Sequence, residues 1–294
     1  MIITQLTGGI GNQMFQYAFA RSLSLQFHSD LYLDIYSYEW DSLRDYELDA
    51  FNISPKIADR GVIDSVKKSK PSLKIRLLFK LKRKPIPNYY FPHIKELKFS
   101  YNETVSKIPN QSVYLEGYWQ SAKYFEKYRN EILKDFKLKN RLGIEANRYK
   151  EQILRSKVSI SVHVRRGDYV QNPETTAYHG LCDLNYYFKA IQKIQDEVVK
   201  PVFFIFSDDK DFVKVEFGQL SNCVFVENLD SDIEELMLMS YCAHNIIANS
   251  SFSWWGAWLN NNSDKIVIAP KQWFKIQEMQ NQTHDLIPNQ WIRL

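Results

Sequence analysis

The stretch SISVHVRRGDYV, from Ser159 to Val170, joins a short apolar strand directly to two arginines. Side chains alternate along a strand, so we expect His163 and Arg165 on one face and Arg166 on the other. An arginine is costly to bury unless something pairs with it. The stretch therefore predicts either a strand that ends where an anionic ligand binds or a surface ion pair at a strand end.

Around this stretch, apolar strands alternate with helical segments. We expect strands at 157–164, 201–207, 223–226, 245–249 and 265–270, and helices at 184–198, 210–220, 232–243 and 253–260. Such alternation predicts an α/β fold with a parallel sheet covered by helices on both faces. Ligands of these sheets bind at the carboxyl ends of the strands, so the residues that follow each strand are the candidates for a site.

The amino-terminal half begins as a strand, a glycine turn and a helix, IITQL, TGGIGNQ and MFQYAFARSLSLQF. Further strands are expected at 31–38 and 112–120, and a helix over 122–136. Gly9 and Gly11 would bring the backbone close to a ligand, and Asn12 and Gln13 follow them. Tight packing of strand on helix is the alternative, since Met14 replaces the third glycine of a dinucleotide-binding fingerprint.

Length and composition indicate a globular protein of two domains. The chain has 294 residues, of which 45% are hydrophobic and 24% charged. A polar helical connector between Lys137 and Arg155 places the boundary at 150, with domains 1–150 and 151–294. The three cysteines lack metal-ligand spacing and suit the reducing cytoplasm. No stretch is expected to act as a signal peptide or to span a membrane.

Charge is unevenly distributed, although the net charge is only +4. From Ser65 to Lys95 there are ten Lys or Arg residues and no Asp or Glu. We interpret this segment as a basic insertion in the amino-terminal domain. The run LKIRLLFKLKRK is typical of a basic amphipathic helix on an anionic membrane surface, with 67–84 as the contact. A solvated loop is the alternative. Nucleic acid is not expected as a partner, because aromatic residues in this run are few.

Two acidic residues follow the strand expected at 201–207. Asp208 and Asp209 could accept hydrogen bonds from a ribose or a guanine base, or could simply cap the next helix. A third interpretation joins Asp209 to Asp211 as ligands of a divalent cation. We expect no metal, since an arginine and a helix amino terminus would neutralise a diphosphate.

The stretch NIIANSSFSWWGAWL ends a strand at Asn249 and starts a helix. Ser250 and Ser251 could cap that helix, and free N–H groups at a helix start also bind phosphate. Phe252 follows them and is included in the expected site. The three tryptophans of this stretch are expected in the core: Trp254, Trp255 and Trp258.

The segments GGIGNQMFQYA, HVRRGDY, FSDD and NSSFSWWGAWL, in this order, resemble glycosyltransferase family 11, the α-1,2-fucosyltransferases. The resemblance covers most of the chain. It implies a GT-B architecture of two Rossmann-like domains facing a cleft, the first for the acceptor and the second for the donor. It also implies inverting, metal-independent and cofactor-free transfer from GDP-β-L-fucose to the 2-hydroxyl of a terminal galactoside, as in bacterial O-antigen or capsule synthesis.

The resemblance also implies roles for individual residues. Arg165 would contact the β-phosphate and His163 would approach the guanine. Ser250 and Ser251 would contact a phosphate of the donor. Asp208 or Asp209 would contact its nucleotide. Apart from the resemblance, we expect Arg166 to serve the protein, with Asp168 as its partner.

The general base is left open. Asp168, Glu174 and His179 follow the arginines, and Asp34 belongs to the strand expected at 31–38. We expect a catalytic set of Arg165, Asp168 and His179. Two further alternatives stay open: a transferase of another linkage or nucleotide sugar, and a non-catalytic nucleotide or glycan binder.

Overall fold

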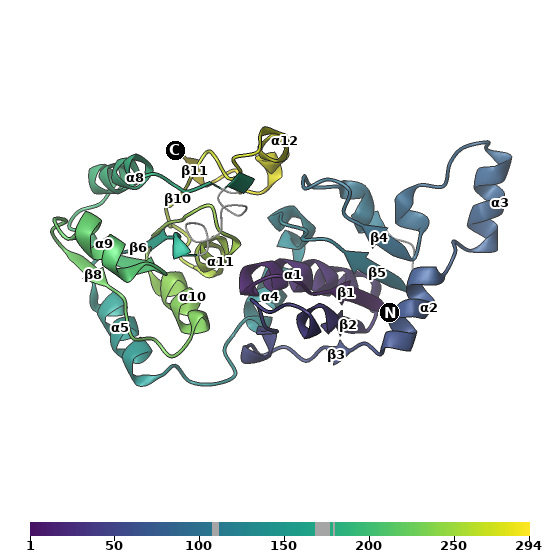
Figure 1. The fold of residues 1–294 in the computed structure, drawn as a ribbon, viewed down its shortest axis with the longest axis horizontal. Helices are drawn as coiled ribbons and strands as arrows, with labels where there is room; N and C mark the ends of the chain where they lie inside the picture. Colours follow the sequence, from purple (N-terminus) through teal and green to yellow (C-terminus); the bar gives the residue numbers. More distant parts are fainter. Residues whose placement is uncertain (108–111, 168–176, 179) are drawn as a thin grey trace. The chain divides into compact units, whose positions relative to one another are not determined.

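Each half of the chain forms its own parallel sheet in the computed structural model, which describes residues 1–107, 112–167, 177–178 and 180–294 (Figure 1). The division lies between Lys139 and Asn140. Helix α5, Ile144–Arg155, belongs wholly to the second unit, because it packs on α10 and its Tyr149 hydroxyl donates to the carbonyl of Phe225. The boundary that the sequence placed at 150 therefore falls inside a helix.

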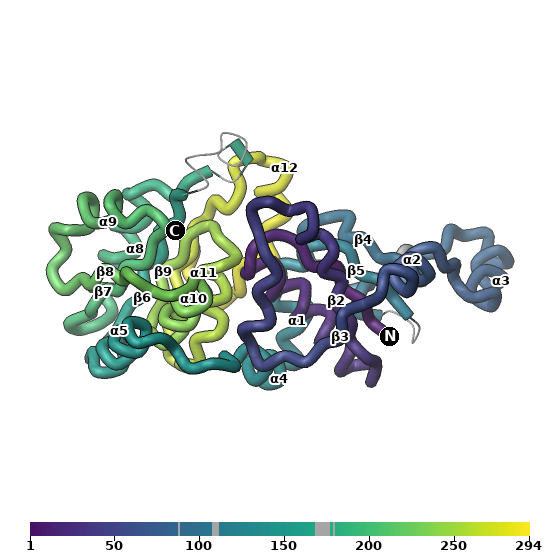
Figure 2. The backbone as a smooth tube through the Cα atoms, turned by 60° about the horizontal axis from the view of Figure 1, so that its bottom comes forward, coloured from purple at the N-terminus to yellow at the C-terminus, as the bar shows by residue number. Residues whose placement is uncertain are grey.

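The amino-terminal unit has a five-stranded sheet in the order β3-β2-β1-β5-β4, with every pair parallel. Its strands are β1 (Ile2–Gln5), β2 (Leu31–Asp34), β3 (Lys56–Ile57), β4 (His93–Lys95) and β5 (Val113–Glu116). Its helices are α1 (Ile10–Phe27), α2 (Arg60–Lys68), α3 (Leu73–Leu81) and α4 (Arg129–Asp135). Helix α1 packs on β1 and β2, whereas α2 packs on β4 and β5 (Figure 2).

Several expected elements of this unit are shorter than the sequence pattern suggested. The second strand ends at Asp34, whose carboxylate accepts the N–H of Tyr36 and starts a 3-10 turn. The expected helix over 122–136 is two 3-10 turns followed by α4. Strands β3 and β4 have only two and three residues, which is too short for a periodic pattern to reveal them.

The carboxy-terminal unit has a six-stranded parallel sheet in the order β11-β10-β9-β6-β7-β8. Its strands are β6 (Ser159–Val164), β7 (Val202–Ser207), β8 (Cys223–Phe225), β9 (His244–Ile246), β10 (Val267–Ala269) and β11 (Ile292–Arg293). Its helices after α5 are α8 (Leu184–Glu197), α9 (Lys210–Phe217), α10 (Asp232–Tyr241), α11 (Ser251–Leu259) and α12 (Gln277–Gln280). The expected alternation of strands and helices is confirmed.

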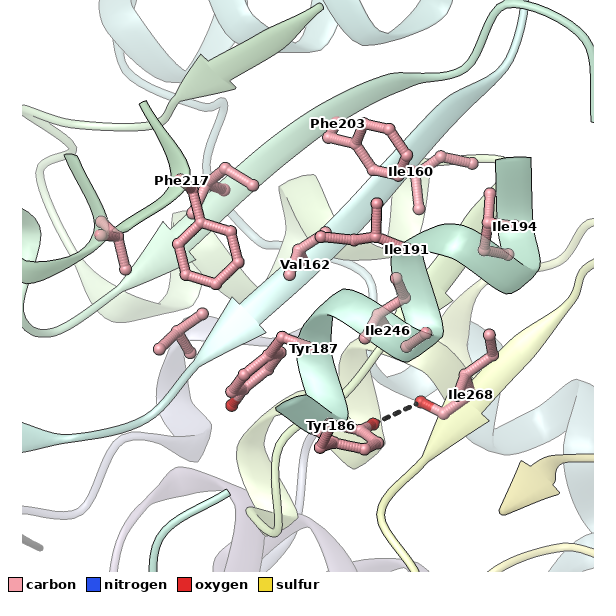
Figure 3. Close-up of a cluster of buried hydrophobic side chains, with 14 residues drawn as sticks. Ile160, Val162, Tyr186, Tyr187, Ile191, Ile194, Phe203, Phe217, Ile246 and Ile268 are labelled. Atoms are coloured by element: carbon pink, nitrogen blue, oxygen red, sulfur yellow. Dashed lines mark hydrogen bonds between the residues drawn. The ribbon is translucent and has the colours of Figure 1, made fainter. Parts of the chain in front are cut away.

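One buried apolar cluster of this unit lies between the sheet and helices α8 and α9. Figure 3 shows Val162, Ile246 and Ile268 from the strands against Tyr187 and Ile191 of α8, all buried. The neighbouring Tyr186 hydroxyl donates to the carbonyls of Ile247 at 2.6 Å and Ile268 at 3.2 Å. Continuous apolar strands are what a sheet covered on both faces requires.

Two further sequence predictions concern membranes. In the part of the chain that the structure describes, no helix combines the length and the hydropathy needed to cross a bilayer. The run that could be an amphipathic helix or a solvated loop contains helix α3, so the loop interpretation is wrong for Leu73–Leu81.

Candidate functional site

The strand order of the carboxy-terminal unit places a binding edge next to Arg165. The sheet runs outward from β6 in one direction to β7 and β8, and in the other to β9, β10 and β11. The chain therefore reverses direction across the sheet between β6 and β9. In open parallel sheets a ligand binds at the carboxyl ends of the strands that flank this switch point. Arg165 follows β6 there, and Ser250 precedes α11 after β9.

Arg165 is held in place by Asp208, which follows β7. The Nε of Arg165 lies 3.0 Å from Oδ2 of Asp208, and Oδ1 accepts the N–H of Arg166 at 2.8 Å. Burial alone would raise the pKa of Asp208, but the Arg165 charge and the N–H groups of Gly167 and Arg166 outweigh it and lower the pKa. Asp208 is thus an ionised carboxylate that orients a cation at the sheet edge.

Gly167 allows this close approach. A Cβ at this position would lie 2.7 Å from Oδ2 of Asp208. Any other residue would push the carboxylate away from Arg165. The glycine of the RRGD run is therefore explained by contact with Asp208.

Arg166 serves the protein, as the sequence indicated, but through Asp209. Its Nε lies 3.1 Å from Oδ2 of Asp209, and its guanidinium carbon lies 3.6 Å from the centroid of the Phe212 ring. The other oxygen of Asp209 accepts the N–H of Phe212 at 3.1 Å and caps α9. The capping interpretation is confirmed for Asp209. The pairing expected with Asp168 lies outside the described residues.

Both oxygens of Asp209 are thus engaged, which disfavours its use as a metal ligand. Among the described residues, no three His, Cys, Asp or Glu side chains gather as a metal site would require.

His163 lies inside the unit on β6, the strand that Arg165 follows. Burial lowers the pKa of its imidazole to about 3, and the charges of Arg165 and Lys210 act in the same direction, against Asp208. The ring is therefore neutral at physiological pH. Its Nδ1 is buried without a hydrogen-bond partner in the described residues. The ring lies 5.5 Å from that of Phe252, so it connects β6 to the start of α11.

The start of α11 is built as the sequence predicted. Ser250 is the N-cap, and its hydroxyl accepts the N–H of Phe252 at 3.3 Å. Ser251 is the first residue of the helix and is half-buried. The first N–H groups of a helix have no partner within it, which favours an anion at this end. The tryptophans of α11 are buried, so their expected core role is confirmed: Trp254, Trp255 and Trp258.

The side chain of Asn249 links two other segments of the chain by hydrogen bonds. Its side-chain amide donates to the carbonyls of Gly180 at 3.2 Å and Trp273 at 3.1 Å, and its oxygen accepts from the Cys182 thiol at 3.4 Å. The side chain is buried. These contacts explain the asparagine structurally, and its expected contact with substrate stays a prediction.

The amino-terminal unit has a second switch point, between β1 and β5, and the glycine turn lies there. Gly8 has φ 74°, which favours glycine, and Gly9 is the N-cap of α1. The Gln13 amide donates to the carbonyls of Gly8 and Asp45, and its oxygen accepts the N–H of Glu47. Gln13 thus ties the turn to the segment after β2.

Two neighbouring amides tie the same turn to the loop after β5. Asn12 accepts from the Gln120 side chain at 2.7 Å. Gln16 accepts the N–H of Thr7 at 3.0 Å and donates to the carbonyl of Gly117 at 3.1 Å. Sequence reasoning missed Gln16, although it lies in the same run as Asn12. Contacts of Gly9, Gly11, Asn12 and Gln13 with substrate stay predictions.

Sequence reasoning also missed Glu96, directly after β4. Its carboxylate accepts the N–H groups of Tyr118 at 2.7 Å and Trp119 at 3.1 Å. Burial raises the pKa of Glu96 to about 7, although these two hydrogen bonds act against the shift. Trp119 has φ 56°, an uncommon conformation for this residue. Glu96 therefore holds the loop after β5, and nothing in the surrounding polar sequence marks it.

Of the four candidates for the general base, the structure describes only Asp34. Asp168, Glu174 and His179 lie outside the described residues. Asp34 is buried, and its carboxylate accepts from the Tyr114 hydroxyl at 2.6 Å and from the N–H of Tyr36 at 3.1 Å. These contacts favour a structural role for Asp34.

Comparison with known proteins gives a consistent result. The family model described as Glycosyl transferase family 11 matches residues 1–294. An alpha-1,2-colitosyltransferase of Escherichia coli is 33% identical and covers 100% of this chain and 99% of its own length. The O-antigen biosynthesis glycosyltransferase WbnK of Escherichia coli is 34% identical, over 98% of this chain and 99% of its own. The galactoside 2-alpha-L-fucosyltransferase Sec1 of Mus musculus is 29% identical, over 64% of this chain and 51% of its own length.

Among solved structures, the NodZ alpha-1,6-fucosyltransferase soaked with GDP-fucose aligns with a TM-score of 0.50 and 16% identity. The alignment covers 88% of this chain and 91% of NodZ. At this identity the likeness concerns the fold alone. Together with the two parallel α/β sheets, it confirms the expected GT-B fold.

Proposed function

Because the chain belongs to glycosyl transferase family 11, we propose that it transfers L-fucose from GDP-β-L-fucose to the 2-hydroxyl of a terminal galactoside. Transfer proceeds with inversion and without a metal ion. The product is a bacterial cell-surface glycan of the O-antigen or capsule type, which agrees with the similarity to WbnK, an O-antigen biosynthesis glycosyltransferase.

The observation that supports the proposal most is the pairing of Arg165 with Asp208 at the switch point of the carboxy-terminal sheet. As the bond from the anomeric carbon to the diphosphate breaks, negative charge grows on the departing GDP. A fixed guanidinium stabilises that charge more in the transition state than in the ground state. The positive end of the α11 dipole, at Ser251, acts on the same charge.

In the same step the acceptor 2-hydroxyl attacks the anomeric carbon and gives its proton to a base. Asp168 and His179 keep this role as predictions. The amino-terminal unit binds the acceptor, and its glycine turn and the loop held by Glu96 lie at the edge where a ligand is expected.

The proposed place of action is the cytoplasm. The three cysteines are free thiols, and Cys242 is buried. Burial raises the pKa of the Cys182 thiol to about 12, which keeps it protonated and unreactive. Asn249 begins an Asn-Ser-Ser sequence but is buried, so a glycan attached to it would not fit in the fold. Both observations suit a reducing compartment without N-glycosylation.

Colitose is the second candidate for the transferred sugar. The colitosyltransferase of Escherichia coli is similar over the full length of this chain. Colitose is fucose without its 3-hydroxyl, so one hydrogen bond to that hydroxyl would decide between the two donors. A site that bonds the hydroxyl rejects the deoxy sugar strongly, whereas an apolar site discriminates weakly.

The experiment that tests the proposal supplies GDP-fucose, GDP-colitose and GDP-mannose in parallel, with β-galactosides as acceptors. The linkage of the product is then determined by NMR. We expect an α-1,2-fucosylated galactoside. Turnover with GDP-colitose only would favour the second donor, and another linkage would contradict the assigned acceptor position. GDP binding without any product would support the non-catalytic alternative.

A further inference from the structure

Helix α3 is largely exposed. None of its nine residues is buried, whereas α2, which has the same length and precedes it, buries Ile63 and Val66 against the sheet. Figures 1 and 2 both show α3 beyond α2, away from the strands of its own sheet. A nine-residue helix has little stability of its own in water. An additional surface that packs on α3 would stabilise it.

The exposed side of α3 is a row of leucines. Leu73, Leu77 and Leu81 are four residues apart, so they follow one another along one face of the helix. Their exposed fractions are 78%, 59% and 74%, and that of the neighbouring Leu78 is 40%. Single exposed leucines are common, but a contiguous row marks an interaction surface.

The other side of α3 faces its own unit. Ile75 and Phe79 are half-buried, and the Phe79 ring lies 5.4 Å from that of Tyr90. Ser72 caps the helix by accepting the N–H of Ile75. The contact of Phe79 with Tyr90 therefore orients the helix so that the leucine row is turned outward. A groove of about 470 Å³ runs beside the row, lined by Leu73, Arg76, Leu77, Phe79, Lys80, Lys84, Pro85 and Ile86.

Cations surround the leucine row. The helix carries Lys74, Arg76 and Lys80, and Lys82, Arg83 and Lys84 follow it directly. No acidic residue lies between Ser65 and Lys95. Within the described ranges, no ion pair involves a cation of 70–84, whereas Lys68 of α2 pairs with Asp64. The positive charge of this surface is therefore not neutralised by the unit that carries it.

We propose that α3 and the cations beside it dock this protein on an anionic lipid bilayer. The leucine row enters the boundary between headgroups and acyl chains, and the long lysine and arginine side chains reach the lipid phosphates. An anionic bilayer supplies the apolar layer and the negative charge together, as this surface requires. The docking does not depend on the proposed sugar transfer.

A second copy of the chain fits this surface less well. Symmetric pairing of two α3 helices would place the same cations opposite one another, and like charges repel. Self-association through α3 is therefore the competing outcome that the experiment must detect.

The experiment measures flotation of the full-length chain with vesicles of phosphatidylcholine alone and of phosphatidylcholine mixed with phosphatidylglycerol. We expect binding to the mixed vesicles at low salt. The binding should decrease at least ~tenfold at high salt, because counterions screen the cations from the lipid phosphates. Vesicles of phosphatidylcholine alone should bind poorly.

Two combined variants separate the apolar and the charged contributions. Leu73→Gln with Leu77→Gln and Leu81→Gln removes the row but keeps a good helix former at each position. Lys74→Gln with Arg76→Gln and Lys80→Gln removes charge. Each should lower vesicle partitioning at least ~tenfold, with an unchanged melting temperature, because these side chains are exposed. Leu154→Gln, at an exposed leucine of α5, is the matched control and should bind as the wild type does.

The proposal is overturned by wild-type protein that does not float with anionic vesicles at low salt, or by a leucine variant that floats as well as wild type. A concentration-dependent dimer that the leucine variant abolishes would assign the surface to self-association instead. Transfer to a soluble galactoside should be equal in wild type and variant. Loss of transfer with intact flotation would contradict the proposed function and leave the docking surface standing.

Discussion

Replacing Arg165 by lysine tests whether a planar guanidinium at the end of β6 is what stabilises the departing diphosphate. Arginine offers several donors in a fixed plane, and its Nε already bonds Asp208 at 3.0 Å. Lysine keeps the charge but has one nitrogen. That nitrogen can meet Asp208 or a ligand phosphate, but not both with good geometry.

The expected loss follows from the bond that lysine cannot make. A hydrogen bond between charged groups contributes about 1.5–3 kcal/mol. Arg165 is mostly buried, so water replaces that bond poorly. We expect the loss near the upper part of the range, ~2.7 kcal/mol of transition-state stabilisation, which is a roughly hundredfold decrease in kcat/KM.

The assay measures kcat/KM for GDP-fucose together with the melting temperature, and Arg166→Lys is the matched control. Arg166 bonds Asp209 and stacks on Phe212, so its replacement should lower the melting temperature and leave the kinetics near those of wild type. Equal kinetic losses in the two variants, with unchanged melting temperatures, would refute this division between a ligand-binding arginine and a structural one.

Four further results are expected. Excess EDTA should leave transfer unchanged, because Arg165 and the start of α11 supply the positive charge; loss of activity that Mn²⁺ restores would contradict this. Gly167→Ala should lower kcat/KM roughly tenfold or more by displacing Asp208, and an unchanged value would mean that the carboxylate does not need its position. Of Asp168→Asn and His179→Asn, the variant that removes the base should abolish transfer but keep GDP affinity; if both keep near-normal kcat, neither residue is the base. Glu96 has a pKa raised to about 7 in the folded protein, so its contribution to stability is present at acid pH and is lost as pH rises through 7. The glutamine of the Glu96→Gln variant does not titrate, so the melting temperature of wild type should fall relative to that of the variant between about pH 5 and about pH 8. A difference in melting temperature that stays constant over this range would argue against the raised pKa.

The sequence by itself determined the elements and the edge where function is expected. Strand and helix periods are local properties, and so β6, β7 and α11 could be predicted within a few residues. Because all strands of such a sheet are parallel, the residues after them gather at one edge in any strand order. Arg165, Asp208 and Ser250 could therefore be named as candidates without knowing the order of the strands.

The tertiary structure decided which of these residues meet. Arg166 and Asp208 are 42 positions apart, and no local pattern shows that Asp208 accepts the N–H of Arg166 while its other oxygen pairs with Arg165. The strand order brings β6 beside β7, and this adjacency selects Asp208 and Asp209 as partners of the two arginines. Glu96 acquires its raised pKa in the same way, because burial by the loop after β5 desolvates it. Pairing and desolvation depend on distances through space between segments remote in sequence, so they exist only once the sheet has formed.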